Sequence, residues 1–121
     1  MFFKITEFNC QCQSPTCTAP HIEIALVLAL ERVRKALGHP IRITSGVRCA
    51  AHNKRVGGVK SSQHLVGQAA DITCEAGHRD RLYELCQEEP AFKGIGDGRA
   101  TKGFIHVDVR PEKDRKAWTY N

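Results

Sequence analysis

The feature that most constrains the fold is an apolar stripe with helical spacing between residues 22 and 37. Apolar side chains recur there at steps of three and four residues, which places them on one face of an α-helix. The stripe consists of Ile22, Ala25, Leu26, Ala29, Leu30, Val33 and Leu37. Gly38 and Pro40 follow it, as is typical of a helix end. The sequence therefore predicts a long amphipathic helix that covers an apolar surface formed elsewhere in the chain.

Three segments have the composition of β-strands. Residues 41–44 and 69–73 are rich in apolar and β-branched side chains, and residues 104–109 alternate most clearly. Shorter helices are predicted at residues 50–56 and 78–87. Turns are predicted at Gly94, Gly96, Gly98 and Gly103. Because these elements do not follow a regular βαβ rhythm, we expect an α+β fold with a small antiparallel sheet packed against helices.

Length and charge limit the classes of protein to consider. A chain of 121 residues predicts a single domain spanning residues 1–121. No apolar run approaches the roughly 18 residues of a membrane span, so membrane insertion is not expected. The net charge of +5 favours an anionic partner, such as nucleic acid or the bacterial cell wall. Aromatic residues are few and do not interleave with basic ones, which argues against nucleic acid.

The six cysteines leave several structures open. They are Cys10, Cys12, Cys17, Cys49, Cys74 and Cys86, an even number that permits three disulfides. The N-terminus does not resemble a signal peptide, which predicts synthesis in the cytoplasm and reduced thiols. Cys10, Cys12 and Cys17 lie close enough in sequence to hold a metal, although the first two are closer than in most zinc knuckles. The alternative is a loop with partly buried thiols and no metal.

Three side chains from two segments could form a metal site. Asp71 lies in a predicted strand beside apolar Ile72, where a carboxylate must be paired or bound to a metal. A turn at Gly67 would bring His64 back to it, and His106 lies on the polar face of the strand at 104–109. Two nitrogens and one oxygen with an open fourth position form the pattern of catalytic zinc. Such zinc lowers the pKa of a bound water to about 7 and polarises a substrate carbonyl.

A motif around these residues resembles a known family. The run Ser62-x-His64-x-x-Gly67-x-Ala69-x-Asp71 is similar to the SxHxxGxAxD signature of the D-alanyl-D-alanine carboxypeptidase family of zinc peptidases. Residues 44–53 and 56–62 are similar to the same family. Residues 104–108 resemble a strand of a small peptidoglycan peptidase subgroup common in bacteriophages. The resemblance extends from about Phe3 to Trp118.

The resemblance implies a hedgehog- or DD-peptidase-like fold with one zinc ion per chain. The implied ligands are His64, Asp71 and His106. It also implies that Arg48 holds a substrate carboxylate, a task suited to a guanidinium fork, although Arg48 could instead be a turn residue in a salt bridge. Ser62 is implied to hydrogen-bond the substrate backbone.

The general base does not follow from the family pattern. Several branches carry an acidic residue three positions before the last histidine ligand, where this chain has Gly103, and others carry a histidine where it has Phe104. Asp108 is the nearest candidate for the catalytic base. It could instead orient a ligand histidine or pair with an arginine. Asp97 is a second candidate.

We therefore expect a monomeric zinc metallopeptidase that hydrolyses peptide bonds in peptidoglycan stem peptides. It would act as a D-Ala-D-Ala carboxypeptidase or an endopeptidase, in the manner of a phage endolysin that reaches the cell wall after release. The main alternative is a catalytically inactive, zinc-stabilised cell-wall-binding module, because hedgehog signalling domains resemble this fold and serve as binding modules.

Overall fold

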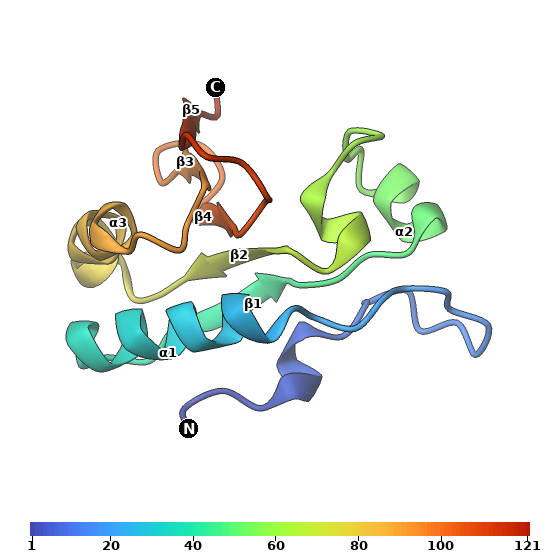
Figure 1. The fold of residues 1–121 in the computed structure, drawn as a ribbon, viewed down its shortest axis with the longest axis horizontal. Helices are drawn as coiled ribbons and strands as arrows, with labels where there is room; N and C mark the ends of the chain where they lie inside the picture. Colours follow the sequence, from blue (N-terminus) through green and yellow to red (C-terminus); the bar gives the residue numbers. More distant parts are fainter.

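The computed structural model describes all 121 residues as one mixed five-stranded sheet with three α-helices (Figure 1). The strands are β1 (Arg42–Ser45), β2 (Ala69–Thr73), β3 (Gly94–Gly98), β4 (Phe104–Asp108) and β5 (Lys116–Thr119), in the order β1-β2-β4-β3-β5. The helices are α1 (Ile24–Leu37), α2 (Ala50–Arg55) and α3 (Arg79–Glu88), with short 3₁₀ helices η1 (Ile5–Phe8), η2 (Gln63–Val66) and η3 (Ala76–His78). The expected α+β class is confirmed in this form.

Two expectations about the sheet were wrong. The sheet is not purely antiparallel, because β5 pairs in parallel with β3. The glycines at 94, 96 and 98 do not form turns but lie in β3, which pairs with both β4 and β5. Glycine is rare in strands, so composition favoured turns at these positions. In the structure, the Asp108 carboxylate lies beside Gly94, the Trp118 indole beside Gly96 and the Phe104 backbone beside Gly98.

The core lies between the sheet and α1. Ile72, Ile105 and Val107 of the central strands are buried together with most of the predicted stripe of α1, which ends at Leu37. The predicted stripe was wrong at one position, because Ala25 is exposed and Val27 is buried instead. Figure 1 shows α1 and α3 side by side at one end of the molecule, with α2 and η2 at the opposite end. None of the helices is long and apolar enough to cross a membrane.

Candidate active site

The register of the central strands brings Asp71 and His106 together. Asp71 of β2 is the direct partner of His106 on the antiparallel strand β4. Side chains at such paired positions leave the same face of a sheet. The Nδ1 atom of His106 lies 3.2 Å from Oδ1 of Asp71, and both residues are buried.

A tight turn brings His64 to the same carboxylate. His64 lies in η2. Ser62 caps the start of this helix, because its hydroxyl accepts a hydrogen bond of 3.2 Å from the His64 backbone N–H. Gly67 ends η2 at φ 74°, a left-handed conformation that glycine adopts readily. The chain then enters β2, and Nε2 of His64 lies 3.3 Å from Oδ1 of Asp71. One donor atom from each of His64, Asp71 and His106 lies within 4.8 Å of the others.

In each of the two histidines, the ring nitrogen that faces away from Asp71 has an oxygen partner, and this partner fixes the orientation of the ring. Nδ1 of His64 lies 2.6 Å from the carbonyl oxygen of Gly46, and Nε2 of His106 lies 2.7 Å from Oδ2 of Asp108. In neutral imidazoles these nitrogens carry the proton, so the opposite nitrogens present lone pairs toward Asp71.

This donor set fits zinc. Two imidazole lone pairs and Oδ1 of Asp71 converge on one point, while Arg48 pairs with the other carboxylate oxygen, Oδ2. Tetrahedral zinc with bonds of about 2.0–2.1 Å has ligand–ligand edges of about 3.3 Å. The two nitrogen–oxygen distances at Asp71, 3.3 and 3.2 Å, match such edges.

The charges of the site depend on each other. Burial raises the pKa of Asp71, but its contacts with the His106 and His64 imidazoles lower it more, so the carboxyl stays ionised far below its usual range. Burial lowers the pKa of His106, but Asp108 and Asp71 raise it more. Asp71 and Asp108 therefore stabilise a positive charge at or beside His106.

Asp108 lies behind His106 rather than over the converging donor atoms. Its side chain is fully buried and contacts Nε2 of His106, the nitrogen that faces away from Asp71. Arg110 donates to both of its oxygens, at 2.8 and 2.7 Å. Burial raises the pKa of Asp108, but its hydrogen bonds with Arg110 and His106 lower this pKa by more, so the carboxylate is held as the anion. This geometry favours an orienting role over that of a base.

Asp97, the second candidate base, lies elsewhere. Its two oxygens pair with the guanidinium of Arg99 at 2.9 and 2.8 Å, and it does not line the cleft described below.

Three hydrogen bonds position the guanidinium of Arg48 beside the donor set. Arg48 donates to Oγ of Ser45 at 3.0 Å, to Oδ1 of Asn53 at 3.2 Å and to Oδ2 of Asp71 at 3.2 Å. Arginine has five N–H groups, so one N–H on each terminal nitrogen is left for another acceptor. Sequence reasoning missed both orienting partners, Ser45 and Asn53, because only the fold brings their oxygens to the guanidinium.

An open cleft of about 960 Å³ lies over these residues. Arg48, Ser62 and the three convergent donor residues all line it. The other charged lining residues are Lys102, Arg110, Lys116 and Glu112, so cations predominate in the cleft.

Trp118 forms part of the cleft wall although it is two strands away from His106. Gly96 of β3 lies between them, paired with His106 on one side and with Trp118 on the other. Because Gly96 has no side chain, the indole lies across it, and its ring centroid is 5.1 Å from that of His106. This contact crosses β3 and therefore depends on the register of three strands.

A cleft with two histidines and one carboxylate at its floor is typical of metal-dependent hydrolases. The chain matches the family model described as Peptidase M15 over residues 1–108. It therefore belongs to this family of zinc D-Ala-D-Ala carboxypeptidase type, as the motif around Asp71 indicated. The comparison with curated proteins gave no significant match.

Proposed function

We propose that this protein is a zinc-dependent peptidase that cleaves peptide bonds in the stem peptides of peptidoglycan, in the manner of an endolysin. The observation that carries the proposal is the convergence of His64, Asp71 and His106 on one point at the floor of an open cleft. The predominantly cationic cleft suits a substrate rich in free carboxylates. Membership of the Peptidase M15 family supports the reaction class.

Five residues of the cleft have assigned roles in this proposal. His64, Asp71 and His106 would hold zinc, which when bound acts as a Lewis acid toward a peptide carbonyl and makes water acidic enough to react near neutral pH. Arg48 binds a substrate carboxylate through its two free N–H groups. Ser62, at the rim of η2, binds the substrate backbone.

Asp108 supports the site from behind. Its carboxylate accepts a hydrogen bond from Nε2–H of His106 and thereby keeps Nδ1 free for the metal. Arg110 holds the carboxylate in place and balances its charge.

Mass spectrometry of purified peptidoglycan after digestion tests the proposal. Loss of a terminal D-alanine from stem peptides would indicate a carboxypeptidase, and cleavage of cross-links would indicate an endopeptidase. The His106→Ala variant is the matched control and should leave the peptides intact. If the wild-type protein sediments with peptidoglycan but leaves every peptide unchanged, the protein is a wall-binding module and the proposal is wrong.

A further inference from the structure

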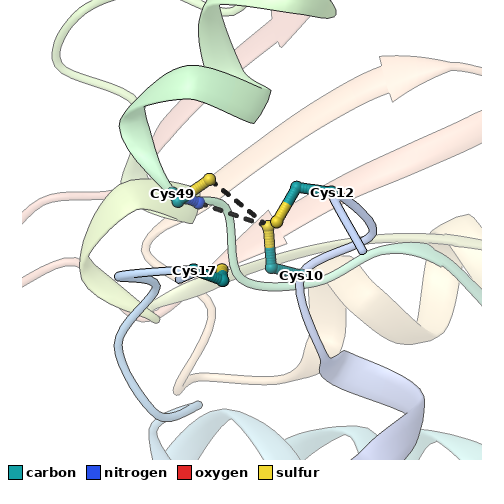
Figure 2. Close-up of side chains that lie close together, drawn as sticks. All are labelled: Cys10, Cys12, Cys17 and Cys49. Atoms are coloured by element: carbon teal, nitrogen blue, oxygen red, sulfur yellow. Dashed lines mark hydrogen bonds between the residues drawn. The ribbon is translucent and has the colours of Figure 1, made fainter. Parts of the chain in front are cut away.

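A second group of possible metal ligands lies outside the cleft. Cys10, Cys12 and Cys17 come from the N-terminal loop, and Cys49 immediately precedes α2 (Figure 2). Their four sulfur atoms all lie within 4.8 Å of one another. Cys49 is separated from the other three by more than thirty residues, so the sequence spacing gave no indication that it completes the group.

The distances between the sulfur atoms distinguish a metal site from a disulfide. Sγ of Cys10 lies 3.8 Å from Sγ of Cys49. A disulfide bond is only about 2.05 Å long. A tetrahedron with zinc–sulfur bonds of about 2.3 Å has sulfur–sulfur edges of about 3.8 Å. The observed separation therefore has the length expected for two ligands of one tetrahedral zinc ion.

Three of the four sulfurs have backbone hydrogen-bond donors beside them. Backbone N–H groups donate to three of them, each at 3.4 Å: Ser14 to Cys12, Cys49 to Cys10, and His52 to Cys49. A neutral thiol is a weak acceptor, whereas a thiolate bound to a metal carries charge that such donors stabilise. Arg55 lines the same small pocket and adds a positive charge near the group.

We propose that Cys10, Cys12, Cys17 and Cys49 bind a structural zinc ion that is separate from the site at His64, Asp71 and His106. Four protein ligands leave no open position for substrate, which is the arrangement of structural zinc. The expected zinc content therefore rises from one ion per chain to two.

The fold shows what this ion would hold together. It would link the N-terminal loop to the backbone that leads from Gly46 to α2. The Val47 N–H donates to the carbonyl of Phe8 at 2.9 Å, and the Phe8 backbone lies so close to Gly46 that a Cβ there would overlap it. The carbonyl of Gly46 in turn orients His64. The cysteine site thus supports the backbone that positions the catalytic histidine.

Cobalt substitution tests the proposal without reference to activity. Thiolates bound to Co²⁺ give an intense sulfur-to-metal charge-transfer absorption, whereas the site at His64 has no sulfur ligand. Wild-type protein loaded with Co²⁺ should show this absorption, and the His64→Ala variant should keep it. The Cys12→Ser/Cys17→Ser variant should lose it together with one of two zinc ions. Cys74→Ser, which changes a cysteine outside the group, is the matched control and should retain the absorption and both zinc ions.

Three results would overturn the proposal. One is the absence of thiolate absorption in cobalt-loaded wild-type protein. Another is a single zinc ion per wild-type chain that disappears in His64→Ala. The third is mass spectrometry of the unreduced protein that shows disulfides among the four cysteines. The wild-type measurements need no variant to fold. Peptidase activity enters none of these tests, so failure of the proposed function would not affect them.

Discussion

His106 is the residue in which the geometry of the candidate site is most closely determined. Its Nδ1 faces Asp71 at 3.2 Å and its Nε2 faces Asp108 at 2.7 Å. Trp118 lies against the ring, so the imidazole has little freedom to rotate. A ligand histidine fixed in this way does not lose side-chain freedom when a metal binds.

Replacing Asp108 by asparagine distinguishes its two candidate roles. If Asp108 orients His106, Asp108→Asn should weaken zinc affinity by roughly 10–100-fold, and excess zinc should restore most of the activity. If Asp108 were the general base, the variant would keep its zinc while turnover fell by about 10²–10⁴-fold. Zinc titration combined with turnover at saturating zinc measures both quantities.

Replacing Arg48 by lysine tests carboxylate binding. Lysine keeps the positive charge but loses the two-pronged fork. For a peptide with a free C-terminal carboxylate, kcat/KM should fall about 10–100-fold, corresponding to one or two lost charged hydrogen bonds. The same peptide with a C-terminal amide is the control and should be affected much less. Equal losses for both peptides in a variant with full zinc content would exclude this role.

The sequence was most informative where local chemistry dominated. Asp71 beside Ile72 signalled a buried carboxylate, and Gly67 signalled the turn that returns His64 to it. It was less informative about Arg48, whose partner Asp71 lies in β2, and about Asp108, for which the neighbouring His106 left both candidate roles open. The carbonyl of Gly46 had no signal at all, because every residue has a carbonyl and only the fold selects one.

Among the elements, β3 shows why composition misled the strand prediction. A strand interior weakened by glycine is stable here because β4 and β5 pair with it on both sides. Their side chains use the room that the glycines leave, Asp108 at Gly94 and Trp118 at Gly96. The low strand propensity of glycine can be read from the sequence, but the neighbouring strands that require a glycine at these positions cannot. The edge strand β5 was missed for a related reason, since its four residues are largely exposed.

Gly94→Ala should therefore disturb the donor set indirectly, by displacing Asp108 from His106. A Cβ at Gly94 would overlap both oxygens of Asp108. We expect a loss of about 1–3 kcal/mol in the free energy of unfolding, as for other overpacked positions, and weaker zinc binding. Gly77→Ala is the matched control, because nothing lies within 4 Å of a Cβ there. Chemical denaturation and zinc titration would measure both effects, and identical behaviour of the two variants would contradict this account of β3.

The contact between α1 and the end of α3 should make stability depend on pH. Arg32 of α1 donates to the buried carboxylate of Glu89 at 2.6 Å. Burial raises the pKa of Glu89, but the hydrogen bonds from Arg32 and the Ala91 N–H lower it more, to below its usual value of 4.5. A lowered folded-state pKa contributes stability that is present above about pH 4.5 and is lost as the pH falls through the folded value.

Glu89→Gln should remove this contribution. At pH 7 we expect the variant to lose about 1–3 kcal/mol of unfolding free energy, the usual value for a hydrogen bond to a charged group. The difference from wild type should shrink as the pH falls below about 4.5. Glu88→Gln, at an exposed neighbouring position, is the control and should change little. A difference between Glu89→Gln and wild type that stays constant from pH 7 to pH 3 would contradict the assignment.

At the scale of the whole molecule, two sites share one scaffold. The donor residues of the cleft come from η2, β2 and β4, while the cysteine group joins the N-terminal loop to the start of α2. The segment from Ser45 to Cys49 lies between them and contributes to both, through the Gly46 carbonyl, Arg48 and Cys49. This convergence depends on contacts between segments far apart in the chain, which the sequence alone does not specify.

The central claim is that zinc at His64, Asp71 and His106 makes this chain a peptidase. The most direct test measures the release of free amino groups from purified peptidoglycan by zinc-loaded wild-type protein and by Asp71→Ala at equal concentration. Circular dichroism would establish that both are folded. The account predicts steady release by the wild type and release at background by the variant. No release by folded, zinc-containing wild-type protein, or equal release by Asp71→Ala, would contradict it.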